Sequence, residues 1–265
     1  MGILQGQMAG FYGKKAFQAF FERLFFIALR GMNYGNGSDY EKSGEKYIFG
    51  LINRIFSDKE IVIFDIGANI GGYSRALIQN IKTPFRIYAF EPTTFCVNEL
   101  EKIDHINFIY HQLGFSNNPG TAEIHYDYDG SVWASIENSG YERIKKQLSR
   151  TETIKLETID RFLEEHSISH IDFLKIDVEG HELKAFQGAK DAIEHGRITM
   201  IQFEFGLASL YAGNRLTDFF SILQNYDIYR ILQDGLQKMT YHESFEIYLT
   251  TNYLAVDKKA NFKIS

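Results

Sequence analysis

Four short apolar runs of this chain each end in an acidic residue, and helical patterns separate them. The runs are residues 61–64, 86–90, 171–176 and 199–203, and the acids that follow them are Asp65, Glu91, Asp177 and Glu204. A continuous apolar run is typical of a strand that is covered on both faces. Strands that alternate with helices predict a mainly parallel α/β sheet with helices on both sides. Because ligands of such sheets bind at the carboxyl ends of the strands, we expect the four acids to border one crevice.

The composition is that of an ordinary globular chain. Its 265 residues are 45% hydrophobic and 23% charged, which excludes the disordered and collagen-like classes. The single cysteine, Cys96, can form neither an internal disulfide nor a multi-thiolate zinc site. A cytoplasmic location is therefore the default expectation. The net charge of −6 gives no general attraction for polyphosphate, so we expect no nucleic-acid partner.

Residues 16–30 form an apolar stretch near the N-terminus. Glu22 and Arg23 interrupt it, and it is shorter than the about 20 apolar residues of a membrane span, so we expect no transmembrane segment. The residues at helical spacing are Phe17, Phe20, Phe21, Leu24, Phe25 and Ala28. They predict a helix with a broad apolar face. We expect this face to dock on the core of the chain, or on a second copy in a homodimer, in preference to a membrane surface.

The strand and helix alternation breaks once, at residues 116–153. This region has a turn at NNPG, an alternating strand at 121–128 and a polar segment with aromatic residues. Segments of this length in a compact domain are commonly lids or binding loops. We therefore divide the chain into an N-terminal helical extension, 1–58, that packs on the core, and an α/β domain, 59–258, with a lid-like insertion at 116–153. Trp133 and the tyrosines of the insertion offer flat surfaces for a ring of an acceptor.

The turn after the first strand, FDIGANIGGYS at residues 64–74, leads directly into a helix. This context suits a nucleotide-type ligand, because the backbone can approach closely and amide donors are exposed. A Walker loop would need lysine where Tyr73 stands. A dinucleotide fingerprint would need glycine in place of Asn69. S-adenosylmethionine fits better, because it has no phosphate, its ammonium suits Asp65, and Glu91 can accept both ribose hydroxyls.

Five segments carry a family resemblance. They are FDIGANIGGYS, AFEP at 89–92, LETIDRF at 156–162, FLKIDVEGHEL at 173–183 and IQFEFG at 201–206. In this order and spacing they resemble the FkbM-type family of S-adenosylmethionine-dependent methyltransferases. The resemblance implies a class I, Rossmann-like three-layer sandwich with a mainly parallel seven-stranded sheet. It also implies O-methylation of a sugar or polyketide hydroxyl.

The resemblance also implies a cofactor site at the strand ends. The expected cofactor-binding residues are Asp65, Gly67, Ala68, Asn69, Gly71, Tyr73, Ser74, Glu91, Pro92, Gly114, Phe115 and Asp177. The glycine-rich turn would line the methionine end, Glu91 would bind the ribose, and residues 113–116 would bind the adenine.

The segment DVEGHE at residues 177–182 offers the catalytic groups. Methyl transfer from a sulfonium is an in-line displacement, so positioning is the main requirement. A hydroxyl reacts better as it loses its proton, and we predict His181 as the base, since its ordinary pKa is about 6.5. Asp177 is the rival, and Glu179 is the third candidate. A Mg²⁺ ion held by Asp177 and Glu204 is an alternative way to lower the pKa of the hydroxyl.

We therefore expect an S-adenosylmethionine-dependent O-methyltransferase that acts on a hydroxyl of a sugar, a glycan or another small natural product. Two alternatives stay open. A nucleic-acid methyltransferase would need a basic groove beside the pocket. An S-adenosylmethionine-binding scaffold that has lost its activity would bind the cofactor without turnover.

Overall fold

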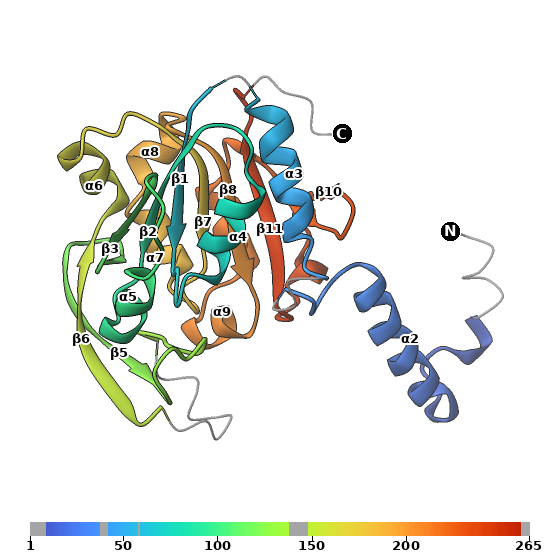
Figure 1. Cartoon of the computed structure of the whole chain (residues 1–265). Helices are drawn as coiled ribbons and strands as arrows, with labels where there is room; N and C mark the ends of the chain where they lie inside the picture. Colours follow the sequence, from blue (N-terminus) through green and yellow to red (C-terminus); the bar gives the residue numbers. More distant parts are fainter. Residues whose placement is uncertain (1–8, 38–41, 58, 138–147, 261–265) are drawn as a thin grey trace.

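An eight-stranded sheet runs through the part of the chain that the computed structural model describes, which is residues 9–37, 42–57, 59–137 and 148–260 (Figure 1). In sheet order, its strands are β10 (Leu236–Lys238), β9 (Tyr226–Ile231), β11 (Thr251–Asp257), β8 (Ile198–Phe205), β7 (Ile171–Ile176), β1 (Ile61–Ile66), β2 (Phe85–Phe90) and β3 (Phe108–His111). Strands β3, β2, β1, β7 and β8 run parallel to one another, and β11 runs antiparallel to both β8 and β9.

The mainly parallel α/β sheet is confirmed, but it has eight strands where we expected seven. The additional strand is β10, which pairs antiparallel with β9 at the edge of the sheet. Its three residues, Leu-Gln-Lys, are too few to show the alternation by which a half-buried strand is found in a sequence.

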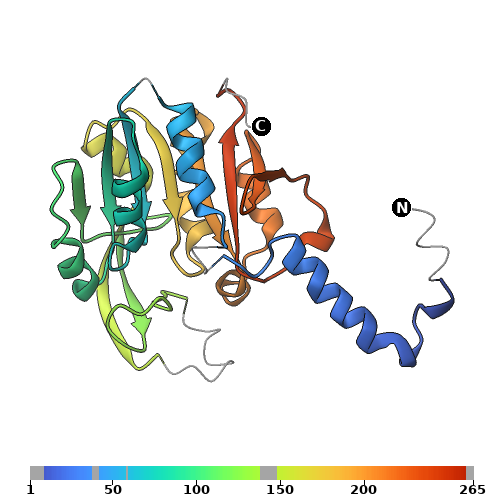
Figure 2. The same cartoon turned by 45° about the vertical axis from the view of Figure 1, so that its right-hand side comes forward.

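Helices cover both faces of the sheet. They are α3 (Glu45–Ile55), α4 (Gly72–Asn80), α5 (Thr94–Leu100), α6 (Ile159–Glu165), α7 (Glu182–Gln187), α8 (Lys190–Glu194), α9 (Leu207–Ala212) and α10 (Leu216–Ile222). Successive residues of a strand point to opposite faces. Ile63 of β1 accordingly packs with α3 and α4 in one apolar core, whereas Phe64 packs with α6, α7 and α10 in the other. Figure 2 shows α3 and α4 on the face turned to the viewer.

A second, smaller sheet extends beyond the carboxyl ends of the parallel strands (Figure 2). Its strands are β4 (Gly114–Phe115), β6 (Arg150–Glu157) and β5 (Gly120–Tyr126), in that order. Ile124, Ile154 and Leu156 form a small apolar core between them. The described part of the predicted lid-like insertion thus contributes β5 and the first half of β6 to an antiparallel ladder, and residues 138–147 lie outside the described residues.

The N-terminal helix is present but does not dock as expected. Two short 3-10 turns, η1 (Ala9–Phe11) and η2 (Lys15–Phe17), lead into α2 (Gln18–Gly31), which extends away from the body (Figures 1 and 2). Of the fourteen residues described for α2, Leu29 is the buried one. The expected packing on the core is thus wrong for α2, whereas α3 does pack on the sheet. None of the described helices is long and apolar enough to cross a membrane.

Candidate active site

The glycine-rich turn between β1 and α4 brings the ends of three strands together. Gly67 donates its N–H to the carbonyl of Phe90 at 3.0 Å. The N–H of Asp177 donates to Ile66, also at 3.0 Å. Gly67 has a φ of 80°, and a Cβ placed on it would lie 1.8 Å from the carbonyl oxygen of Asp177. The close approach of β1 to the end of β7 therefore requires glycine at this position.

A cavity of about 120 Å³ lies next to this turn, at the carboxyl ends of the strands. Of the expected cofactor-binding residues, those that line it are Gly67, Asn69, Glu91, Pro92, Gly114, Phe115 and Asp177. The candidate bases Glu179 and His181 line it as well. The structure thus brings four segments to one small cavity: the glycine-rich turn, the end of β2, the strand β4 and the end of β7.

Glu91 is held in place on the wall of this cavity. Its Oε1 accepts hydrogen bonds from the N–H of Thr93 at 3.1 Å and from the Thr93 hydroxyl at 2.6 Å. Its Oε2 accepts from the N–H of Asn69 at 3.0 Å. Burial raises the pKa of Glu91, and these donors oppose the rise. The three donors fix the direction in which the carboxylate faces.

The remaining expected cofactor residues do not line the smaller cavity. Asp65 is fully buried beneath the turn, where its Oδ2 accepts from the Ser74 hydroxyl at 2.6 Å. Ala68 is buried and donates its N–H to Phe90. Gly71 precedes the first residue of α4, with a φ of 84°. Tyr73 donates its hydroxyl to Gln202 at 3.1 Å. The four acids consequently do not share one crevice, because Asp65 lies below it.

A larger cavity of about 640 Å³ adjoins the smaller one. The two share three wall residues, Val132, Asp177 and Glu179. The charged residues on the wall of the larger cavity are Glu45, Arg75, Lys175, Asp177, Glu179 and Glu204. Trp133 lies on the same wall, so the aromatic residue expected from the insertion does face this cavity.

Lys175 lies buried between these carboxylates. Its Nζ is 3.0 Å from Oδ2 of Asp177 and 4.9 Å from the centre of the Tyr73 ring. Burial alone would lower the pKa of Lys175, but the carboxylates of Asp177, Asp65 and Glu45 raise it above the ordinary lysine value. The ammonium therefore stays charged and balances the acids around it.

Two acids of the larger cavity are held in surroundings that favour the neutral form. Burial raises the pKa of Glu204 well above its usual value, and Asp177 and Glu179 add to the rise. Burial likewise raises the pKa of Glu45. Within the described residues, no group of three or more His, Cys, Asp or Glu side chains is arranged to hold a metal ion. Asp177 and Glu204, the pair suggested for Mg²⁺, both line the larger cavity.

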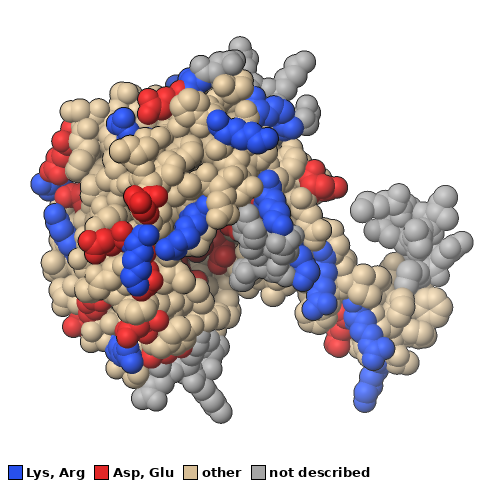
Figure 3. Space-filling view, viewed as in Figure 1, with Lys and Arg blue, Asp and Glu red and all other residues tan. Residues whose placement is uncertain are grey.

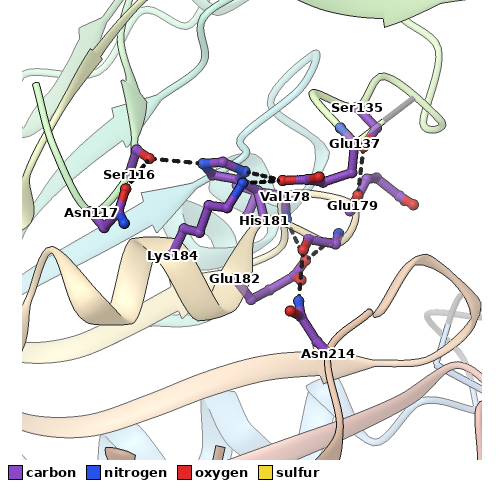
Figure 4. Close-up of polar contacts among 11 residues, drawn as sticks. Ser116, Asn117, Ser135, Glu137, Val178, Glu179, His181, Glu182, Lys184 and Asn214 are labelled. Atoms are coloured by element: carbon purple, nitrogen blue, oxygen red, sulfur yellow. Dashed lines mark hydrogen bonds and ion pairs between the residues drawn. The ribbon is translucent and has the colours of Figure 1, made fainter. Parts of the chain in front are cut away.

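His181 connects α7 to the smaller sheet (Figure 4). Its Nδ1 is 3.1 Å from Oε1 of Glu137, and its Nε2 is 3.0 Å from the Ser116 hydroxyl. Lys184 also binds Glu137, at 2.6 Å. The hydrogen bond to His181, together with Lys184, lowers the pKa of Glu137 to about 2. Both ring nitrogens of His181 are therefore engaged, and no pattern in the sequence indicates a partner 44 residues away.

Glu182 shapes the turn that carries the candidate bases. Its Oε1 accepts from the N–H groups of Val178 at 3.0 Å and Gly180 at 3.1 Å (Figure 4). Asn214 donates to the carbonyl of Gly180 at 2.9 Å from the other side. Glu179, with a φ of 50°, is thus held in a left-handed conformation between β7 and α7.

The protonation of Glu182 predicts a pH-dependent stability. Burial raises the pKa of Glu182 to about 7. Because its pKa is higher in the folded state, the stability it contributes is complete below its unfolded pKa and is lost as pH rises through about 7. We expect the free energy of unfolding to fall by on the order of 2–3 kcal/mol between pH 5 and pH 8 through this group.

Glu182→Gln should remove most of this fall, because glutamine keeps the Oε1 acceptor and has no proton to lose. Urea denaturation of both proteins across this pH range measures the effect. The control is Glu165→Gln, at an exposed acid on α6. If the free energy of unfolding of Glu182→Gln fell with pH as steeply as that of the wild type, Glu182 would not be the group responsible.

Comparison with known proteins places these motifs in a family. Residues 65–241 match the family model described as the methyltransferase FkbM domain. Hexuronic acid methyltransferase AglP of Haloferax volcanii is 24% identical over 152 residues, covering 57% of this chain and 59% of that protein. The chain therefore spans less than two thirds of the length of this relative.

Solved structures of methyltransferases are also similar. Methyltransferase FkbM from Methylobacillus flagellatus has a TM-score of 0.47 and 19% identity, over 75% of this chain and 44% of that chain. The plantazolicin methyltransferase BpumL in complex with SAH has a TM-score of 0.44 and 11% identity, over 86% and 89%. Since the matched family model spans more than half of the chain, this protein belongs to the FkbM methyltransferase domain family.

Proposed function

We propose that this protein transfers a methyl group from S-adenosylmethionine to a hydroxyl group of a sugar or glycan. The observation that carries the proposal is the pair of adjoining cavities, which meet at Asp177 and Glu179. The smaller one has the wall residues that suit an adenosine, and the larger one has room for a sugar ring. The hexuronic acid methyltransferase among the relatives supports a sugar acceptor.

The residues of the smaller cavity fit an adenosine. A carboxylate offers about four lone-pair positions, and Glu91 uses three of them for Thr93 and Asn69. One position is left for a ribose hydroxyl, so Glu91 would bind the diol with one oxygen, not with both as the sequence suggested. Gly114 and Phe115 would lie beside the adenine, and Asp177 would lie at the methionine end. Asp65 would act from below, by supporting the first turn of α4 through Ser74.

The two acids shared by the cavities, Asp177 and Glu179, are the proposed proton acceptors. S-adenosylmethionine, when bound, supplies an electrophilic methyl group, and the acceptor hydroxyl must lose its proton on attack. Asp177 lies where the two cavities meet, and Lys175 fixes its carboxylate. We propose that Asp177 accepts the proton of the hydroxyl, with Glu179 as the second candidate. His181 is then a positioning residue, because Glu137 and Ser116 occupy its nitrogens.

Glu91→Ala is expected to weaken the binding of S-adenosylhomocysteine about tenfold to a hundredfold, because a charge-assisted hydrogen bond to the ribose is lost. Isothermal titration calorimetry measures the effect. Glu152→Ala is the matched control, since Glu152 accepts from the N–H of the neighbouring Thr94 at 3.0 Å and does not line the smaller cavity. Equal affinities of the Glu91→Ala variant and the wild type would show that the ribose binds elsewhere.

The charge of the larger cavity predicts its preference among sugars. Of the four acids that face it, Glu45 and Glu204 favour the neutral form, so Asp177 and Glu179 supply its negative charge, and its two cations are already engaged. Lys175 binds Asp177, and Arg75 donates to the carbonyls of Ile70 and Glu99. A carboxylate on the acceptor would meet like charges, which is costly. We expect kcat/KM for a methyl glucoside to exceed that for the matched methyl glucuronide by at least about tenfold. Faster methylation of the glucuronide would contradict this preference.

The proposed function itself is tested by incubating the protein with S-adenosylmethionine labelled in the methyl group and a set of neutral, amino and acidic glycosides. Parallel reactions contain Mg²⁺ or EDTA, which tests the metal alternative. Label on an oxygen of a glycoside supports the proposal. Binding of S-adenosylhomocysteine without transfer to any glycoside would refute the sugar acceptor.

A further inference from the structure

The N-terminal arm, residues 9–31, carries a concentration of exposed apolar side chains. Those that are at least 42% exposed are Phe11, Tyr12, Phe20, Leu24, Phe25, Phe26 and Ile27. Ring contacts within the arm join Phe11 to Phe17 at 4.7 Å and Tyr12 to Phe21 at 5.8 Å. The arm is therefore internally packed, while much of its apolar surface faces solvent. Apolar patches of this kind mark interaction sites.

The base of the arm is firmly attached to the body. Leu29 is 3% exposed, and the Asn33 side chain donates to the carbonyl of Ile231 at 3.0 Å. Tyr34 is buried against Arg230, whose guanidinium lies 4.6 Å from its ring and donates to its hydroxyl at 2.9 Å. Gly37, just beyond the base, lines the larger cavity. The arm thus presents its apolar surface from a fixed position beside that cavity.

The charges on the arm are mostly positive. It carries Lys14, Lys15, Arg23 and Arg30 but a single acid, Glu22. The whole chain, by contrast, has a net charge of −6. Figure 3 shows the lysine and arginine side chains along the arm. A basic segment on an acidic protein favours a partner with negative charge.

The shape of the apolar face distinguishes between partners. Pairing with a second helix needs only a narrow seam at heptad spacing, such as Phe20, Leu24 and Ile27. The exposed Phe25 widens the apolar face of α2 beyond such a seam. At about 1.5 Å per residue, α2 is about 21 Å long, less than the about 30 Å of a bilayer core. A broad apolar face with flanking cations suits a helix that lies in the surface of a membrane.

We propose that the arm binds the surface of an anionic lipid bilayer, with the α2 aromatic face among the acyl chains and the four cations at the headgroups. The attachment at Asn33 and Tyr34 then holds the mouth of the larger cavity near the membrane. Membrane binding by the arm is independent of the proposed function, because residues 9–31 line neither cavity.

Sedimentation with vesicles tests the proposal on the full chain. The vesicles are phosphatidylcholine alone, or phosphatidylcholine mixed with phosphatidylglycerol. The wild type is expected to sediment with the mixed vesicles and to be released by salt. Phe25→Glu/Ile27→Glu should weaken binding at least about tenfold, and each of Lys14→Gln and Lys15→Gln about fivefold. Ile106→Glu is the matched control, since Ile106 is 93% exposed on the body, and it should bind as the wild type does.

Two results would overturn the proposal. The first is a wild type that stays in the supernatant with both kinds of vesicle. The second is a Phe25→Glu/Ile27→Glu variant that sediments as the wild type does. Sedimentation velocity measures the oligomeric state of both proteins without vesicles. If the wild type is a dimer, the Phe25→Glu/Ile27→Glu variant is a monomer and neither binds vesicles, a second copy of the chain covers the arm and the proposal is wrong.

Discussion

Gly67→Ala is expected to destabilise the fold by at least about 4 kcal/mol, because the new Cβ has no space. It would lie 1.8 Å from the carbonyl oxygen of Asp177 and 2.8 Å from the carbonyl carbon. These are backbone atoms, and the N–H of Asp177 is tied to Ile66. The φ of 80° adds strain for a residue with a side chain. Urea denaturation gives the free energy of unfolding.

Gly72→Ala is the matched control in the same turn. Gly72 is the first residue of α4, and a Cβ there would meet nothing within 4 Å. Alanine is a better helix former than glycine by roughly 0.5–1 kcal/mol, so Gly72→Ala should be neutral or slightly stabilising. Equal stabilities of the two variants would show that β1 and β7 do not approach each other as described.

Lys175→Met is expected to destabilise the protein by about 3–5 kcal/mol at neutral pH, because it leaves buried carboxylates without their counter-charge. The side chain of Lys175 is 8% exposed and lies between Asp177, Asp65 and Glu45. Methionine has a similar length, so the lost charge dominates the lost packing. Chemical denaturation at several pH values measures the effect.

The pH dependence separates this electrostatic cause from a packing defect. Burial raises the pKa values of both Asp65 and Glu45. Their protonation at acidic pH removes the unbalanced charges, so the cost of Lys175→Met should shrink as pH falls. Asp65→Asn added to Lys175→Met should recover part of the loss. Lys190→Met is the control, because the Nζ of Lys190 forms a surface ion pair with Glu194 at 3.8 Å. It should change the free energy of unfolding by less than about 1 kcal/mol. If Lys175→Met changed the free energy of unfolding as little as Lys190→Met does, the buried-charge interpretation would be wrong.

The sequence was sufficient to predict the central strands and the wall of the smaller cavity. The continuous apolar runs in β1 and β7 have no other good explanation than strands covered on both faces. Gly67 and Glu91 were predicted from what a nucleoside-binding turn would require, and both line the smaller cavity. These features are local, so a short stretch of chain contains the signal.

The alternation of side chains along β1 also predicts the position of Asp65. Asp65 follows Ile63 by two residues and therefore faces the α3 and α4 side of the sheet. Its neighbour across the ladder is Lys175, which points the same way. The period of two thus indicates a buried acid beneath the crevice, on the same side of the sheet as Lys175, instead of an acid on its wall.

Other features have no local signal. The contact between His181 and Glu137 joins segments 44 residues apart, and only the folded β4–β6–β5 sheet brings them together. The helical period of residues 16–30 shows which side of α2 is apolar, but it does not show what covers that side. The packing of α2 therefore had to come from the structure.

A crystal structure of the protein with S-adenosylhomocysteine tests the central claim most directly. We expect the adenine beside Gly114 and Phe115, a ribose hydroxyl on Glu91, and the sulfur at Asp177, facing the larger cavity. Electron density for the nucleoside outside the smaller cavity, or a sulfur turned away from the larger one, would contradict the claim that methyl transfer takes place where the two cavities meet.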